Sequence, residues 1–116
     1  MHVTRLFTGQ DGESHFEDSD LPLRDIGGSE QRSAPLPATG LIFRETGAGY
    51  DWQWHNAPCR QFVITLQGNA EIVVGDGTVR HFGPGDILLA EDTTGHGHIT
   101  RAVDAQPRTS IFITLE

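Results

Sequence analysis

The stretch YDWQWHNAPCRQFVITLQG, residues 50–68, decides the fold. An aromatic run ends at His55, the turn Asn56-Ala57-Pro58 follows, and the apolar run QFVITL leads to a glycine. Aromatic and β-branched residues favour strands, and proline interrupts them because it lacks a backbone donor and restricts the residue before it. A second stretch, residues 83–98, runs from a Gly-Pro-Gly turn through an apolar segment to two histidines. Two strand pairs that each end near histidines predict a barrel whose mouth holds a small-molecule or metal site.

Short strands separated by turn residues continue along the rest of the chain. No window carries the apolar spacing of a helix. This pattern is typical of all-β sandwiches and barrels, and we favour a jelly-roll barrel because it leaves a cavity between two sheets and protects most strand edges. The alternative for residues 14–17 is an exposed N-terminal segment. The strands are expected at residues 3–7, 14–17, 41–46, 50–55, 61–66, 70–74, 78–82, 86–90, 96–103 and 109–115.

Two turns carry specific predictions. Asp76-Gly77 lies between two β-rich runs and predicts a type I′ hairpin, which needs a positive φ at both central residues. Gly83-Pro84-Gly85 predicts a type II turn, because proline sets the first φ and glycine accepts the positive second one.

Residues 18–40 are poor in apolar side chains and contain three of the six prolines. This composition predicts a long loop, and such loops in compact domains are usually functional or mobile. The loop is expected to wrap the barrel, cover its mouth or contact a partner subunit. Residues 1–116 should form a single domain, with N-terminal strands and the long loop in residues 1–40 and the barrel core in residues 41–116.

The composition excludes several classes of protein. The 116 residues carry a formal net charge of −8, and the eight basic residues, all arginines, are outnumbered by sixteen acidic ones. A nucleic-acid-binding protein needs a basic face, so no nucleic-acid partner is expected. There is no signal peptide and no apolar run of roughly 18 residues, so we expect a cytoplasmic protein without a membrane partner. Cys59 is the only cysteine, which rules out an intrachain disulfide.

Side chains alternate across a strand, and this assigns the polar candidates to faces. If the polar faces point inward, the candidate side chains converge at the barrel mouth. A bulge at the turn Asn56-Ala57-Pro58 would change which residues point inward. Three sets follow from the alternation: Gln61, Val63 and Thr65 share a face; His96, His98 and Thr100 share a face; and Gln53 and His55 lie opposite Trp52 and Trp54.

The chain resembles a small single-domain cupin over about residues 40–115. Cupins carry a first motif G-x5-H-x-H-x3-4-E-x6-G and a second motif that many members relax to a Pro-Gly-Asp turn with a histidine about ten residues later. Gln61, with six residues between it and Gly68, takes the place of the first-motif glutamate. His55 then falls on the first histidine and Ala57 on the second. Pro84-Gly85-Asp86 matches the second turn, and either His96 or His98 follows it as the histidine.

The resemblance implies a divalent metal held by three histidines and one glutamate. Here the candidate ligands are His55, Gln61, His96 and His98, and the candidate metals are Fe, Mn, Ni, Cu and Zn. Glutamine replaces glutamate and alanine replaces a histidine, so the set carries no charge. This favours a loosely held metal or none.

The resemblance also implies an enzyme acting on a small organic molecule in the barrel, of dioxygenase, isomerase or lyase type. His98, His96 and Gln61 are the catalytic candidates: a histidine that is not a ligand serves as the acid–base group, and Gln61 orients the substrate. Two further candidates are Cys59 as a nucleophile and Glu91-Asp92 as a general acid or base. The alternative is a non-catalytic or metal-free small-molecule-binding protein. By analogy of fold, a homodimer is expected.

Overall fold

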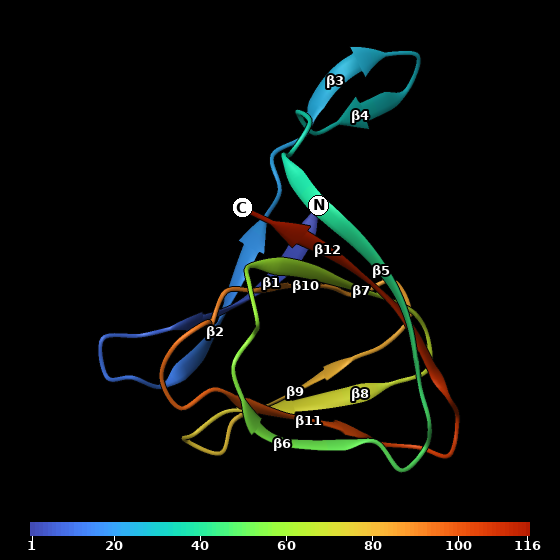
Figure 1. The fold of residues 1–116 in the computed structure, drawn as a ribbon. Helices are drawn as coiled ribbons and strands as arrows, with labels where there is room; N and C mark the ends of the chain where they lie inside the picture. Colours follow the sequence, from blue (N-terminus) through green and yellow to red (C-terminus); the bar gives the residue numbers. More distant parts are fainter.

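The computed structural model describes residues 1–116, and all of its regular structure is β-strand (Figure 1). Two sheets face each other and enclose the interior. The larger has six strands in the spatial order β2 (Ser14–Asp20), β1 (His2–Thr8), β10 (Ile87–Ala90), β7 (Gln61–Gln67), β12 (Arg108–Leu115) and β5 (Ala38–Thr46). The smaller has four in the order β6 (Asp51–His55), β11 (His98–Ala102), β8 (Ala70–Val73) and β9 (Val79–Phe82). The all-β, jelly-roll prediction is confirmed. The structure contains no helix that could cross a membrane.

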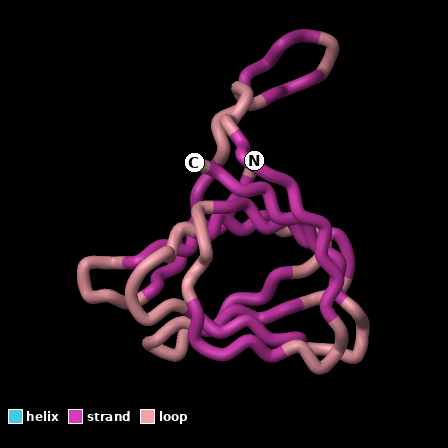
Figure 2. Tube along the Cα trace, in the orientation of Figure 1, coloured by secondary structure: helices cyan, strands magenta, loops and turns pink.

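Residues 18–40 differ from the expected long loop. They contain the end of β2, the start of β5 and, between them, a hairpin formed by β3 (Arg24–Gly27) and β4 (Glu30–Arg32). The hairpin projects away from the two sheets (Figures 1 and 2), and all of its strand residues are exposed. It lacks the alternation of apolar residues by which a half-buried strand is recognised, and this is why the sequence pattern missed it.

The N-terminal strand belongs to the larger sheet. β1 pairs in parallel with β10 and antiparallel with β2. Val3 and Leu6 on β1 are buried and contribute to the interior. The first strand therefore belongs to the same sheet as strands from the second half of the chain.

The turn at Gly75-Asp76-Gly77 is not the predicted type I′ turn. Only Gly77 has a positive φ, at 88°. The Gly77 N–H donates to the Val74 carbonyl at 3.0 Å, and the Val74 N–H donates to the Thr78 carbonyl at 3.0 Å. These bonds define a three-residue hairpin loop whose last residue is left-handed, the arrangement that places glycine in a G1 bulge. The extra residue, Gly75, decides the turn type.

The turn at Gly83-Pro84-Gly85 agrees with the prediction. Gly85 has a φ of 88°, and the Asp86 N–H donates to the Gly83 carbonyl at 3.0 Å. The Asp86 carboxylate also accepts from the Gly83 N–H at 2.7 Å, which closes the loop from both sides.

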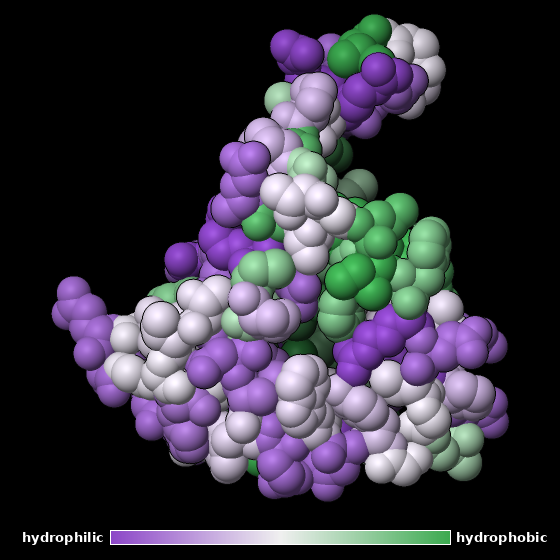
Figure 3. All heavy atoms as spheres, viewed as in Figure 1, coloured by the Kyte–Doolittle hydropathy of each residue, from purple (hydrophilic) through white to green (hydrophobic).

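Strand β5 forms one edge of the larger sheet and carries an unusual apolar surface. Leu41, Ile42 and Phe43 are consecutive and all exposed, with Phe43 at 75%. Figure 3 shows an apolar area on this side of the molecule, below the projecting hairpin. A long apolar edge strand is a ready surface for pairing with another chain.

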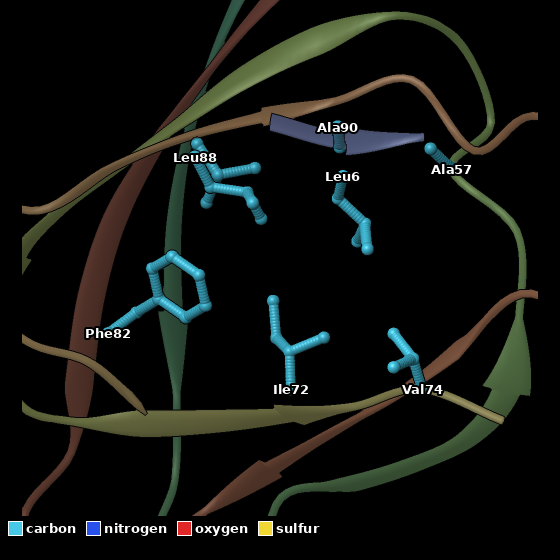
Figure 4. Packing of buried hydrophobic residues seen from close by; sticks show 8 residues of the cluster. Leu6, Ala57, Ile72, Val74, Phe82, Leu88 and Ala90 are labelled. Atoms are coloured by element: carbon cyan, nitrogen blue, oxygen red, sulfur yellow. The ribbon is translucent and has the colours of Figure 1, made fainter. Parts of the chain in front are cut away.

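The hydrophobic core lies between the two sheets (Figure 4). Leu6, Leu88 and Ala90 point inward from the larger sheet, toward Ile72 and Val74 on the opposite side. Phe82, Val63 and Ala57 complete the cluster. The core packs directly beside a cavity. Five residues belong to the core and also line this cavity, namely Leu88, Ala90, Ile72, Val63 and Ala57.

Candidate functional site

A cavity of about 90 Å³ opens between the two sheets. Its apolar wall comes from both sheets and includes Val63, Ile72, Leu88 and Phe112. Such a mixture of apolar wall and a few convergent polar groups is typical of small-molecule sites. The polar lining residues are Arg44, His55, Gln61, His98, Thr100 and Arg108.

His98 is the most firmly held of these polar groups. It is 5% exposed, and its Nδ1 lies 2.5 Å from Oδ2 of Asp92, which is fully buried. The Ser14 hydroxyl donates to the same carboxylate oxygen at 2.7 Å. An Nδ1–H that donates to a carboxylate leaves Nε2 as the acceptor nitrogen and fixes the orientation of the ring. Ser14, Asp92 and His98 thus form a hydrogen-bonded chain that ends at the cavity.

His55 lies beside His98, with the two ring centroids 4.3 Å apart. Its Nδ1 is 2.7 Å from the Gln53 carbonyl, and its ring stacks on Trp52 at 3.6 Å. Burial lowers the pKa of His55 and outweighs the hydrogen bond with the Gln53 carbonyl, which raises it. The neutral imidazole, with Nε2 free to accept a proton, is therefore favoured.

A bulge in β6 corrects the predicted faces of this strand. His98 pairs with His55 and Thr100 with Trp52, so three positions on β6 span two positions on β11. The extra residue places Trp52 and His55 on the cavity together, whereas Gln53 was expected to share the face of His55. The bulge lies within the strand and not at the proline turn that follows it.

His96 does not join the other candidates. It precedes β11, and Gly97 has a φ of 81°, which ends the strict alternation that would have placed His96 with His98 and Thr100. The imidazole stacks on Trp54 at 3.9 Å, and its Nδ1 is 2.8 Å from the Glu13 carboxylate. His96 is not among the residues that line the cavity.

Gln61 and Ala57 are the two cavity residues that the resemblance to cupins matched to the glutamate and the second histidine of the first motif. Gln61 is 5% exposed, lines the cavity and makes no side-chain hydrogen bond to another residue. Its amide is therefore available to a ligand. Ala57 also lines the cavity, at the position that the second histidine takes in the cupin motif.

The neighbouring acids Glu91 and Asp92 have separate roles. Glu91 accepts hydrogen bonds from Arg5 and Arg60, both at 2.6 Å, outside the cavity. Burial raises the pKa of Glu91, but the two arginines outweigh this effect and the pKa is lowered overall. Asp92 alone supports the site, through His98. Cys59 is only partly buried and does not line the cavity.

Two arginines were absent from the candidates. Arg108 and Arg44 line the cavity from the adjacent strands β12 and β5. The last strand was expected to begin at residue 109, which left Arg108 out. Extending the alternation of that strand by one residue places Arg108 on the same face as the buried Ser110. Arg44 stands opposite Ser110 in the register of β5 and β12, a relation that only the strand pairing reveals.

The donors around the cavity do not fit a divalent metal. No three His, Cys, Asp or Glu side chains are grouped so that they could hold a metal ion. Besides the two imidazoles, the cavity offers a metal only the neutral amide of Gln61. The Asp92 carboxylate is already hydrogen-bonded to His98. The guanidinium groups of Arg44 and Arg108 line the same cavity and would repel a cation. A charged ligand set of the kind that holds such metals in proteins is absent.

No protein-family model and no curated protein sequence matches the chain. Solved structures of other proteins do match it. One is a conserved protein with a double-stranded β-helix domain from Klebsiella pneumoniae, with a TM-score of 0.52 and 24% identity over 80% of this chain and 82% of that one. Another is a protein of Neisseria meningitidis, with a TM-score of 0.51 and 17% identity over 66% of this chain and 75% of that one. An RmlC-like cupin of Desulfovibrio desulfuricans has a TM-score of 0.47 and 16% identity over 97% of this chain and 81% of that one.

The likeness to the Klebsiella pneumoniae protein shows the class of fold. The chain has the double-stranded β-helix fold of cupins, as its glycine and proline turns predicted. The interior of this barrel contains the two histidines and two arginines described above.

Proposed function

We propose that this protein is a small cupin-fold enzyme that moves a proton on a compact organic substrate, in a reaction of the isomerase or lyase type. The observation that carries the proposal is the buried chain Ser14–Asp92–His98, which ends at the cavity. Polar groups in a protein interior lower stability unless they are paired, and a paired histidine that faces a cavity has the form of a general acid–base group.

The chemistry follows from the hydrogen bonds of His98. Because Nδ1–H donates to Asp92, Nε2 is free to take a proton from a substrate carbon or hydroxyl. The Asp92 carboxylate then stabilises the imidazolium cation that forms. Returning the proton to a different substrate atom completes an isomerisation, and delivering it to a leaving group completes an elimination.

His55 and Gln61 are proposed to assist at the same cavity. Burial lowers the pKa of His55 and favours its neutral form, whose Nε2 can accept a proton or a hydrogen bond from the substrate. The Gln61 amide can donate to a substrate oxygen on which negative charge develops, as oxyanion-stabilising groups do. His96 has no part in this proposal, because it lies outside the cavity.

Proton transfer can be tested without knowing the natural substrate. The protein is incubated in D2O with small carbonyl compounds and organic acids that bear acidic C–H bonds, and exchange is followed by proton NMR. We expect exchange of at least one compound, and a loss of about 100-fold or more in His98→Gln, the typical contribution of a general base. His96→Gln is the matched control and should retain the wild-type rate. Equal rates in wild type and His98→Gln would overturn the acid–base role.

A metal-dependent enzyme, with an ion held by His55, Gln61 and His98, is the competing hypothesis from the resemblance to cupins. We propose a metal-free site because of the two arginines and the missing charged ligand. Plasma mass spectrometry on protein purified without an affinity tag should find Fe, Mn, Ni, Cu and Zn well below one equivalent per chain. One equivalent that is lost in His55→Ala would contradict the metal-free proposal.

A non-catalytic binding protein is the second candidate. The small cavity and its apolar wall would suit a sensor as well as an enzyme. Such a protein would bind members of the same compound panel without exchanging their protons. Binding that persists in His98→Gln, together with no exchange in wild type, would favour this function.

A homodimer is proposed from the apolar edge strand β5. Leu41, Ile42 and Phe43 are exposed there, and the outer edge of the strand has no neighbour in the sheet. Pairing of two β5 strands around a two-fold axis would extend the larger sheet across both subunits.

A further inference from the structure

Two arginines in the cavity have no carboxylate partner. Five of the eight arginines form ion pairs with aspartate or glutamate, namely Arg5, Arg32, Arg60, Arg80 and Arg101. Arg44 and Arg108 form none, although acidic residues outnumber basic ones by two to one in this chain. The third unpaired arginine, Arg24, lies on the exposed hairpin, where solvent surrounds it. Arg44 and Arg108 are therefore the unpaired arginines of the cavity.

Arg108 is the clearer case because its side chain is deeply buried. It is 6% exposed, its Nη2 donates to the Thr65 hydroxyl at 2.8 Å, and its Nε has no hydrogen-bond partner. Burial lowers the pKa of Arg108, and the neighbouring charge of Arg44 lowers it further. A guanidinium nevertheless stays charged in proteins. A buried charge without a counterion is costly, so its presence calls for a function.

Arg44 brings a second cation to the same place. It lies on β5 next to β12, its guanidinium is 4.9 Å from the centre of the Phe112 ring, and it donates to the Tyr50 hydroxyl. Phenol and aromatic contacts orient this group without neutralising it. No aspartate or glutamate lines the cavity to do so.

We propose that the cavity recognises a small organic acid, whose carboxylate is bound by Arg108 and Arg44. Planar guanidinium groups bind carboxylates through two parallel hydrogen bonds, and an anion would supply the charge that the cavity lacks. The apolar wall of Val63, Ile72, Leu88 and Phe112 fits the carbon skeleton of such a ligand. The volume of about 90 Å³ restricts the ligand to a compact one.

A carboxylate is favoured over a phosphate by the rest of the lining. Phosphate sites in proteins usually add backbone N–H groups at a helix N-terminus, and this chain has no helix. The carboxylate assignment deepens the proposed function and depends on it only for the reacting end of the ligand, which would lie toward His98 and His55.

The test is a binding comparison by isothermal calorimetry. Acetate, pyruvate, malonate and succinate are compared at millimolar concentration with their neutral amides and with inorganic phosphate. We expect at least one carboxylate to bind while its amide does not. Arg108→Met and, separately, Arg44→Met should weaken that carboxylate by about 30-fold or more, as loss of a buried charge partner does. Arg101→Met removes an exposed charge paired with Glu71 and should leave the affinity unchanged.

Stability gives an independent readout for the same variants. Because Arg108 is buried without a counterion, Arg108→Met is expected to melt at the same or a higher temperature than wild type when no ligand is present. A marked loss of thermal stability with unchanged carboxylate affinity would overturn the binding role and make Arg108 a packing residue. Equal binding of acids and amides, tighter binding of phosphate than of every carboxylate, or no carboxylate binding would each overturn the proposal.

The failure of this proposal is distinguishable from failure of the proton-transfer function. Carboxylate binding that survives in His98→Gln without any C–H exchange in wild type would leave the anion site intact and remove the catalytic role. Exchange on neutral compounds alone would leave the catalytic role intact and remove the anion site.

Discussion

Single residues in this site owe their chemistry to a few specific neighbours. His98 and His55 lie side by side in one cavity, yet Asp92 holds the first and a backbone carbonyl holds the second. His96 is two positions from His98 in the sequence, and its partners are Trp54 and Glu13 on the outside. Residue type alone did not separate these three histidines, since the distinction depends on which segments the fold brings against each ring.

The lowered pKa of His55 predicts a stability that depends on pH. Burial depresses its pKa in the folded state below the ordinary value of 6.5, so the unfolded chain binds more protons at mildly acidic pH. Its contribution to stability is therefore present above about pH 6.5 and is lost as the pH falls through the window below that value. Between about pH 7.5 and about pH 5.5, the melting temperature of wild type should fall more than that of His55→Gln. The exposed His81 provides the control His81→Gln, which should follow wild type. Parallel curves for wild type and His55→Gln would contradict the prediction.

Ser14 is predicted to support the site through Asp92. Ser14→Ala removes one of the two donors to a fully buried carboxylate oxygen, which should lower the free energy of unfolding by about 1–3 kcal/mol. Urea unfolding measures this loss. Ser33→Ala is the control, with little change expected, because the half-buried Ser33 hydroxyl donates only to the carbonyl of the next residue, Ala34. A Ser14→Ala protein as stable as wild type would show that the hydroxyl is not needed to hold Asp92.

At the scale of elements, short strands and turns were largely predictable because their signals are local. Glycine and proline mark the turns, and alternation placed Gln61, Val63 and Thr65 on the inner face of β7, where they are found. The deviations came from single extra residues. Because of one bulge in β6, Trp52 and not Gln53 faces the cavity. Gly75 lengthens the turn before β9 to three residues, so it is not type I′.

The turn at Gly77 gives a prediction at this scale. Gly77→Val forces a β-branched residue to a φ of 88°, with no neighbouring atom within 4 Å to complicate the result. The free energy of unfolding should fall by about 1–3 kcal/mol, the cost of a non-glycine residue in this region. Gly49→Val is the matched control, since Gly49 is also in open space but has no positive φ. Equal stability of the two variants, measured by urea unfolding, would show that the backbone at Gly77 relaxes without cost.

At the scale of the whole molecule, the apolar edge of β5 predicts self-association. Light scattering at micromolar concentration should give twice the chain mass of 12.7 kDa. Phe43→Glu places a charge on the most exposed apolar side chain of that edge and should convert the dimer to a monomer. Val103→Glu, at an exposed apolar residue outside any strand, is the control and should remain dimeric. A wild-type mass of 12.7 kDa would exclude the dimer.

The sequence by itself determined the all-β class, the position of most strands, the Gly83-Pro84-Gly85 turn and the inward face of Gln61. These features depend on residues close together in the chain, where backbone stereochemistry and alternation act. Only the tertiary structure decided that Asp92 and Ser14 support His98, that His96 lies outside, and that Arg44 and Arg108 meet in the cavity. Asp92 and His98 are six positions apart, but the other relations join segments that are distant in sequence. They follow from strand pairing and register, which a local pattern does not encode.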